Sequence, residues 1–159
     1  LLLNKLESEG FVNYEISYFG KEGFYSKNNT SYWQAKKYLG IGPSAHSYDG
    51  KKRGWNIRNN SKYIKSISQD ILPLEEEILT IMDRYNEYIM TGLRTIWGLS
   101  LKKIQSEFGK LYYDYVLKQS DKYIKEGLLF ADREMLGVTK KGKFLCDGIA
   151  SDLFMIKLN

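Results

Sequence analysis

Cysteine, histidine and proline are scarce in this chain. Of its 159 residues, one is cysteine, one is histidine and two are proline. A single cysteine, Cys146, excludes an internal disulfide framework and is typical of a reducing compartment. Cys146 and His46 are too few to assemble a zinc or iron–sulfur site within the chain. The scarcity of proline and the lack of low-complexity runs argue against disorder.

Long apolar runs and targeting signals are also missing. No apolar stretch approaches the ~20 residues that span a bilayer, and no basic segment leads into a cleavage site, so we expect a cytoplasmic protein. Residues 1–9 read as the last turns of a helix that Gly10 ends, which predicts that the chain is cut from something longer. The net charge of +5 is spread along the chain. It permits an anionic partner without requiring nucleic acid.

The pattern of residues 1–72 predicts alternating short elements. Aromatic and β-branched residues at 11–19 favour a strand, and the polar stretch 21–32 favours a loop. Residues 38–42 are predicted to form a short apolar strand that leads into a glycine-rich turn. Residues 44–48 are expected to continue in an extended conformation. Further elements are a strand at 55–57 and a helix at 61–69.

Pro73 marks the predicted boundary of a second, more helical part, residues 73–159. Glu75, Glu76 and Glu77 favour a helix N-terminus, and the apolar spacing that follows favours a helix ending at Gly98. The further elements expected are a helix at 101–108 capped by Ser100, a helix at 111–125, strands at 128–130 and 135–138, and a last helix at 140–154 capped by Thr139. The fold class is therefore α+β, with a winged-helix-like second domain.

The glycine-rich stretch Leu39-Gly40-Ile41-Gly42-Pro43-Ser44-Ala45-His46 is the most informative. Glycines at alternate positions let a ligand approach the main chain, where unpaired backbone groups could bind an adenosine or amino-acid moiety. The alternative is a bulge or tight turn in a sheet. Pro43, and the absence of a following helix, exclude a Rossmann dinucleotide site.

Two titratable residues are candidates for binding. His46 has the one side chain whose unperturbed pKa lies near neutrality, so it could be a ligand or proton donor, or a hydrogen-bonded structural residue. Glu15 lies on a predicted strand and points away from Tyr14 and Ile16. It could bind a cation or an amine, or occupy an exposed strand position. Cys146 lacks a basic neighbour to activate it and is expected to be inert.

Residues 28–33, Asn-Asn-Thr-Ser-Tyr-Trp, form a polar loop that runs into two aromatics. Tyr32 and Trp33 could form a flat wall for a planar ligand, or anchor the loop in the core. The winged-helix pattern also raises nucleic-acid binding through lysines of the second half. Against this, the helix that would enter the major groove is rich in tyrosine, carries Asp114 and Asp121, and has no arginine to read base edges.

Several blocks together resemble the HemW family, the oxygen-independent coproporphyrinogen III oxidase-like proteins of the radical S-adenosylmethionine superfamily. The matching residues are Tyr14–Phe19, Ser26, Asn29, Tyr32-Trp33, Tyr38–Gly42, Ala45–Tyr48, Arg53, Asn56, Gly92–Arg94, Gly98–Ser100, Glu126–Leu129 and Thr139–Gly142. The resemblance covers nearly the whole chain in order. It implies the C-terminal part of such a protein: the last strands of an incomplete barrel, residues 1–72, and the family's C-terminal domain, residues 73–159.

The resemblance implies cofactors whose binding sites this chain does not complete by itself. The family's C-x-x-x-C-x-x-C motif, which holds a [4Fe–4S] cluster that cleaves S-adenosylmethionine, would lie upstream of this sequence. The glycine-rich block would line the S-adenosylmethionine site, with Gly40, Gly42, Ala45, His46 and Glu15 as candidates. The whole protein would be an oxidoreductase or a haem chaperone, and this part alone would not be catalytic.

The HemW branch also implies haem or porphyrin as ligand and a haem-acceptor protein as partner. His46 fits this branch, whose His-Asn-x-x-Tyr-Trp motif is proposed to bind haem. Here the motif begins with Asn28, and asparagine is a poor axial ligand. Asn29, Tyr32 and Trp33 remain candidates for contacting haem or substrate, and His46 could replace the missing histidine. A free-standing winged-helix module that binds nucleic acid or protein is the alternative function.

Overall fold

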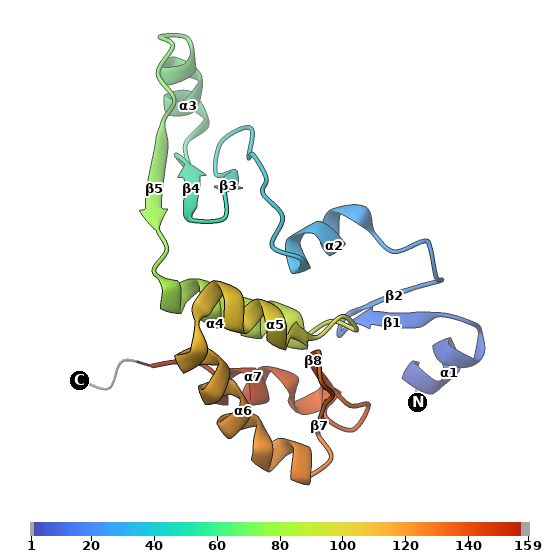
Figure 1. Ribbon diagram of the computed structural model, residues 1–159. Helices are drawn as coiled ribbons and strands as arrows, with labels where there is room; N and C mark the ends of the chain where they lie inside the picture. The colour runs from blue at the N-terminus through green and yellow to red at the C-terminus, as the bar shows by residue number, and fades with distance from the viewer. Residues whose placement is uncertain (1, 157–159) are drawn as a thin grey trace. The chain divides into compact units, whose positions relative to one another are not determined.

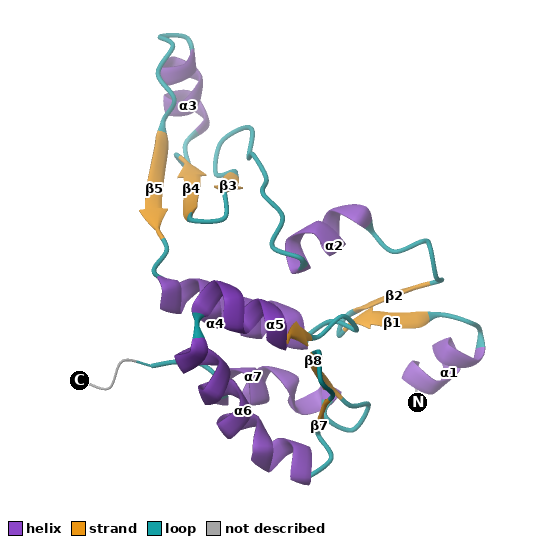
Figure 2. Cartoon of the chain, viewed as in Figure 1, coloured by secondary structure: helices purple, strands orange, loops and turns teal. Residues whose placement is uncertain are grey.

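The computed structural model describes residues 2–156, and helix and sheet alternate along it (Figures 1 and 2). Contacts divide the chain into two compact units. Unit 1 consists of residues 1–34 and 81–159, and unit 2 of residues 35–80. The fold is therefore α+β, as expected. No helix within the described range is long and apolar enough to cross a membrane.

Unit 1 begins with helix α1 (Leu2–Ser8), strands β1 (Val12–Glu15) and β2 (Tyr18–Gly20), and helix α2 (Lys27–Trp33). It resumes with helix α4 (Ile81–Leu93), strand β6 (Leu99–Ser100), the short helix α5 (Leu101–Lys103) and a π-helical turn (Ile104–Phe108). Helix α6 (Lys110–Lys125), strands β7 (Leu129–Ala131) and β8 (Met135–Val138), a 3₁₀ turn (Lys143–Leu145) and helix α7 (Cys146–Asp152) follow. Strands β6, β8 and β7 form an antiparallel sheet in that order.

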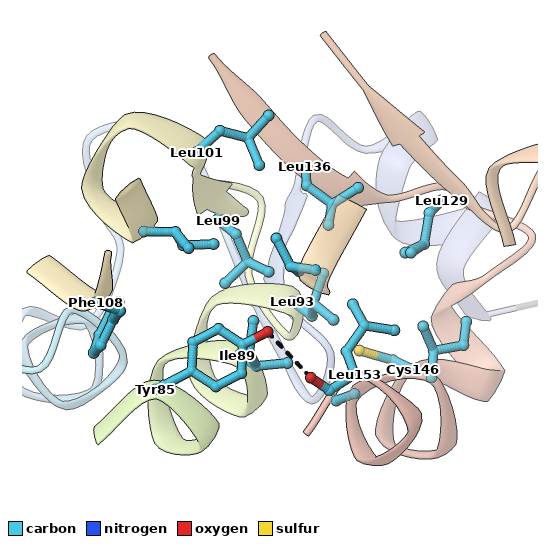
Figure 3. Close-up of a cluster of buried hydrophobic side chains, with 14 of the residues drawn as sticks. Tyr85, Ile89, Leu93, Leu99, Leu101, Phe108, Leu129, Leu136, Cys146 and Leu153 are labelled. Atoms are coloured by element: carbon cyan, nitrogen blue, oxygen red, sulfur yellow. Dashed lines mark hydrogen bonds between the residues drawn. The ribbon is translucent and has the colours of Figure 1, made fainter. Parts of the chain in front are cut away.

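The core of unit 1 lies among these later helices and the small sheet (Figure 3). Tyr85, Ile89 and Leu93 recur every four residues along α4, so they share one face of the helix and are all fully buried. Against them pack Leu99 of β6, Leu136 of β8 and Leu153, the residue that follows α7. The Tyr85 hydroxyl donates a hydrogen bond of 3.2 Å to the Leu153 carbonyl. This bond satisfies a polar group that would otherwise be costly to bury.

The hairpin β1–β2 is joined to the segment that follows α4. The Ile16 amide donates to the Arg94 carbonyl, and the Ile96 amide donates to the Tyr14 carbonyl. Glu15 and Thr95 form an antiparallel bridge. Tyr14 is buried and stacks on Tyr25, with ring centroids 4.5 Å apart. The N-terminal residues therefore form part of the same compact unit as the later helices.

Unit 2 consists of strands β3 (His46–Tyr48), β4 (Lys52–Asn56) and β5 (Leu74–Ile78), with helix α3 (Asn60–Ile67) between β4 and β5. The three strands form an antiparallel sheet in the order β3-β4-β5. Asn59 caps α3, because its side chain accepts a hydrogen bond from the Lys62 amide. The contacts thus separate the two units after Gln34 and after Thr80. The boundary at Pro73 that the sequence predicts concerns the domains of the family, and it stays a prediction.

The prediction of a helix that begins at Glu75 is wrong for the first turn of that helix. Residues 74–78 form strand β5, and α4 begins at Ile81 and ends at Leu93 rather than at Gly98. Every residue of β5 pairs with β4, and Trp55 donates from its indole Nε1 to the Glu75 carboxylate. Pairing with a strand about twenty residues earlier therefore overrides the local preference of these glutamates for a helix N-terminus.

Three further predictions in the first half are wrong. Residues 11–19 are not one strand but a hairpin that turns at Ile16-Ser17. Residues 27–33 are helix α2 rather than loop, capped by the Ser26 hydroxyl, which accepts from the Asn29 amide. Residues 38–42 form no strand beyond an isolated bridge between Tyr38 and Tyr48.

Other elements agree with the sequence. The helices predicted at 61–69 and 111–125 are confirmed as α3 and α6, and the hairpin at 128–138 as β7 and β8. Ser100 caps the helix that follows it by accepting from the Lys103 amide. That helix becomes π-helical after Lys103, and the last helix is shorter than expected, beginning at Cys146. The predicted helix at the N-terminus is α1, with Leu1 outside the described residues.

Candidate functional site

Glu15 is buried at the end of β1 and forms an ion pair with Arg94. Its side chain is fully enclosed, and its Oε1 lies 3.0 Å from Arg94 Nη2 and 3.1 Å from Nε. Its other oxygen, Oε2, accepts a hydrogen bond from the Ser17 amide. Arg94 Nη1 also reaches Asp147 on α7, at 2.6 Å. Glu15 is therefore not an exposed strand residue, and its carboxylate is already occupied by groups of unit 1.

The aromatic pair of the predicted loop is divided between two sides of α2. Trp33 is half-buried and lies under the Arg94 guanidinium, whose carbon is 5.3 Å from the ring centroid. Tyr32 is 50% exposed. Consecutive helical residues point about 100° apart, so Tyr32 and Trp33 do not form one flat wall. Asn29, in the first turn, donates its amide to the Ser26 cap.

The glycine-rich turn of unit 2 is held by its own neighbours. The Gly40 amide donates to the Ser47 hydroxyl, and the Gly42 amide donates to the Tyr63 hydroxyl. The buried side-chain amide of Asn56 donates to the carbonyls of both glycines, at 3.3 and 2.9 Å. The expectation of unpaired backbone groups at Gly40 and Gly42 is therefore wrong, because the fold of the turn uses them.

The two glycines are needed for different reasons. A Cβ added at Gly40 would lie under 3.0 Å from the His46 carbonyl oxygen, so Gly40 permits two backbone segments to touch. Gly42 has a φ of +101°, and nothing lies within 4 Å of the place where its Cβ would be. The open side of Gly42 is thus where another molecule could approach the turn closely. Ala45 is half-buried, and its carbonyl accepts from the Asn56 amide.

His46 is exposed at the start of β3 and pairs with Trp55 on β4. Its ring centroid is 6.5 Å from that of Trp55. The sequence candidates therefore form two groups. Gly40, Gly42, Ala45 and His46 come together in unit 2, whereas Glu15 and Trp33 meet at Arg94 in unit 1.

A polar group that the sequence analysis missed lies beside the Glu15 ion pair. Lys143 donates from Nζ to the Asn13 side-chain oxygen, at 2.6 Å, and to the Asn13 carbonyl, at 3.3 Å. Asn13 is 5% exposed, and its own amide donates to the Glu15, Ile16 and Tyr18 carbonyls. These residues are 130 apart in sequence, so no local spacing could have paired them.

Lys143 and Asn13 line a small pocket within unit 1, together with Arg94, Thr95 and Ile96, and its volume is about 40 Å³. Burial lowers the pKa of the Lys143 ammonium below the ordinary lysine value. The pocket has room for a group of a few atoms and not for a whole cofactor.

The described residues do not fit an iron–sulfur cluster. They contain no group of three or more histidine, cysteine, aspartate or glutamate residues placed to hold a metal ion. Cys146 is enclosed in the core of unit 1, and burial raises the pKa of its thiol to about 11, which disfavours the thiolate that would bind iron. The prediction that Cys146 is inert agrees with this environment.

Comparison with known proteins identifies relatives of the chain. Residues 79–145 match the HemN C-terminal domain. The heme chaperone HemW of Bacillus subtilis is 31% identical over 149 residues, which cover 91% of this chain and 38% of the relative. The HemW of Lactococcus lactis is also 31% identical, over 157 residues that cover 93% of this chain and 41% of the relative. The resemblance inferred from the sequence motifs is confirmed.

A solved structure has the same fold. It is the coproporphyrinogen III oxidase HemN from Escherichia coli, described as a radical SAM enzyme, with a TM-score of 0.71 and 20% identity. The likeness covers 96% of this chain and 39% of that chain. The chain thus spans about two fifths of the length of the curated relatives and of the solved structure that it matches.

Proposed function

We propose that this chain, which is related to the HemW and HemN proteins and carries a HemN C-terminal domain, is the C-terminal part of a radical S-adenosylmethionine protein of porphyrin or haem metabolism. Residues 1–72 would be the edge of its barrel, and residues 73–159 its winged-helix-like domain. The observation that carries the proposal is the extent of the similarity. More than nine tenths of this chain matches about two fifths of each relative described above.

The chemistry of the chain is consistent with a partial protein. A radical S-adenosylmethionine enzyme needs three cysteines for its cluster, and this chain has one, buried in the core. In this proposal the cluster, which would cleave S-adenosylmethionine, is held by residues outside this sequence. What this chain would contribute is unit 1, in which the Glu15–Arg94 pair joins distant segments, and the glycine-rich turn of unit 2.

Sequencing the coding DNA upstream of the Leu1 codon tests this proposal directly. We expect an in-frame C-x-x-x-C-x-x-C motif within the preceding few hundred codons. A stop codon followed by a start codon just before Leu1 would overturn the proposal, because the protein would then have no cluster ligands. A free-standing binding module would be the better reading in that case.

The glycine-rich turn is proposed to line the S-adenosylmethionine site through the open side of Gly42. The backbone amides and carbonyls of Gly40 and Gly42 already form hydrogen bonds within unit 2. S-adenosylmethionine would therefore contact the turn by close approach to its main chain rather than through new hydrogen bonds. We expect Gly42→Val to weaken S-adenosylmethionine binding in the full-length protein, measured by calorimetry. Gly109→Val in unit 1 is the control, because Gly109 also has a positive φ, +94°, and nothing lies within 4 Å of the place where its Cβ would be, so the variant carries similar backbone strain away from the turn. Unchanged affinity in Gly42→Val would contradict this role.

Haem is proposed as a ligand of the whole protein, with weak or no binding through Asn28. Hemin titration should give a Soret shift in the full-length protein that is reduced in His46→Ala if His46 replaces the family's histidine as axial ligand. A tight shift that is independent of His46 and lost in Tyr32→Ala would instead assign the ligand to α2.

Nucleic-acid binding is the weaker alternative. Lys110 and Lys125 of α6 each pair with an aspartate one turn away, Asp114 and Asp121. These pairs offset the charge that would contact phosphates. A steep salt dependence of DNA binding would favour the alternative.

A further inference from the structure

We propose that the pocket between Asn13 and Lys143 binds a carboxylate group of the ligand, with the Lys143 ammonium as its cationic partner. This inference rests on the proposed function, because porphyrins of this pathway carry propionate side chains. It adds a role for unit 1, in which a residue of the HemN C-terminal domain would recognise the edge of the macrocycle.

The charges around the pocket single out Lys143. Arg94 also lines it, but two carboxylates, those of Glu15 and Asp147, already bind its guanidinium. The nearby Lys140 is paired with Glu7. Lys143 forms no ion pair with any residue in the range 2–156, and its two hydrogen bonds both go to neutral oxygens of Asn13. Of the two cations that line the pocket, Lys143 is therefore the one that no carboxylate of the described residues contacts, although Glu7 attracts it without forming an ion pair.

The ammonium of Lys143 is held ready for an anion. An ammonium has three N–H donors, and Asn13 accepts from two of them, so one donor remains. The Asn13 amide is itself fixed, because its nitrogen donates to three carbonyls of the β1–β2 hairpin. The position of the charge is thus set before any ligand arrives, which reduces the entropy lost on binding.

The walls of the pocket strengthen an interaction with a carboxylate. They include the apolar residues Ile16, Leu93, Phe130 and Val138, which make the surroundings of the ammonium less polar than bulk water. An ion pair is stronger where the surroundings are less polar than water. Burial already lowers the pKa of Lys143, so a bound anion would also relieve the cost of enclosing an unpaired charge.

The size of the pocket sets what it can take. At about 40 Å³ it can hold a carboxylate or a water molecule, but not a tetrapyrrole ring. The ring would therefore stay outside while one side-chain carboxylate enters.

Binding of coproporphyrin III and of its tetramethyl ester to the full-length protein tests the proposal. Porphyrin fluorescence anisotropy reports both affinities, and neither probe contains a metal, so axial ligation plays no part. We expect the free acid to bind about tenfold more tightly than the ester, as for a hydrogen bond to a charged group. Lys143→Met should remove this preference and Lys143→Arg should keep it.

Lys141→Met is the matched control, because Lys141 is exposed two residues away and donates to the Glu126 carbonyl outside the pocket. It should leave the preference for the free acid unchanged. The comparison of acid and ester in the wild-type protein needs no variant. Equal binding there would overturn the proposal even if Lys143→Met failed to fold.

Two outcomes would overturn the proposal, and they differ in what they say of the function. If acid and ester bind equally in the wild type, or if Lys143→Met keeps the preference, the pocket does not recognise the ligand's carboxylate while porphyrin binding stands. A carboxylate from elsewhere in the full-length protein that fills the pocket would give this same result. If neither probe binds, the porphyrin part of the proposed function fails together with the inference.

Discussion

Glu15 and Arg94, 79 residues apart in the sequence, form a buried ion pair at 3.0 Å that ties the N-terminal hairpin to the end of α4. The pair is accompanied by main-chain bonds between the same two segments. Arg94 extends it to Asp147 on α7 and to the ring of Trp33 on α2. One arginine thus connects four segments of unit 1, three of them outside the residues that match the HemN C-terminal domain.

Neutralising Glu15 should destabilise unit 1. Glu15→Gln leaves Arg94 with one carboxylate partner and weakens a pair whose acid is fully enclosed, so we expect a loss of about 3 kcal/mol in the free energy of unfolding by urea. The control is Glu9→Gln, which removes an exposed pair with Lys5 and should cost less than about 0.5 kcal/mol. Equal losses in the two variants would show that the buried ion pair stabilises the fold no more than the exposed pair does.

Adding a side chain at Gly40 should disrupt the glycine-rich turn. The Cβ of Gly40→Ala would collide with the His46 backbone, which cannot move without breaking the β3–β4 pairing. We expect faster amide hydrogen exchange at residues 38–48, equivalent to a local loss of about 2 kcal/mol or more. Gly148→Ala, where nothing lies within 4 Å, should instead be neutral or stabilising. Unchanged exchange in Gly40→Ala would contradict the close approach.

The side chain of Asn56 should be as important as the glycines that it holds. It is 2% exposed and donates to the carbonyls of Gly40 and Gly42. Asn56→Ala would leave these carbonyls without that donor, so we expect a loss of about 2 kcal/mol. Asn60→Ala, at an exposed position of α3, is the control. Hydrogen exchange at residues 38–48 distinguishes the two, and a small effect in Asn56→Ala would mean that the turn is held by other bonds.

Cys146 should make the stability of unit 1 depend on pH in the alkaline range. Burial raises the pKa of its thiol to about 11 in the folded state, against an ordinary value of 9.0. The unfolded state therefore releases its proton first, and the stability associated with the neutral thiol is lost as pH rises from about 9 to 11.

Urea unfolding between pH 8 and 10.5 checks this in comparison with Cys146→Ala. The wild type should lose about 1–2 kcal/mol more than the variant over this range. All the tyrosines are present in both proteins, so their contribution to the comparison cancels. Parallel pH profiles of the wild type and Cys146→Ala would show that the thiol has the same pKa in the folded and unfolded states, which would contradict the prediction.

Features that depend on near neighbours in the chain could be predicted from the sequence alone. The four-residue spacing of Tyr85, Ile89 and Leu93 predicts the buried face of α4, and the Ser100 cap and the 128–138 hairpin follow from residues within a few positions of each other. The motif blocks around Tyr14 and Gly40 were sufficient to indicate the relatives. In each case the determining interaction is local, so its pattern can be read along the chain.

Features that depend on partners far away in the sequence became visible only in the folded chain. Glu75–Glu77 lie in a strand because β4 supplies their hydrogen bonds, although acidic residues in such a run favour a helix N-terminus. Glu15 is enclosed rather than exposed because Arg94 neutralises it, and Lys143 faces Asn13 across 130 residues. No local pattern specifies these pairs, since burial of a charge is set by the group that compensates it, and only the folded chain brings that group near.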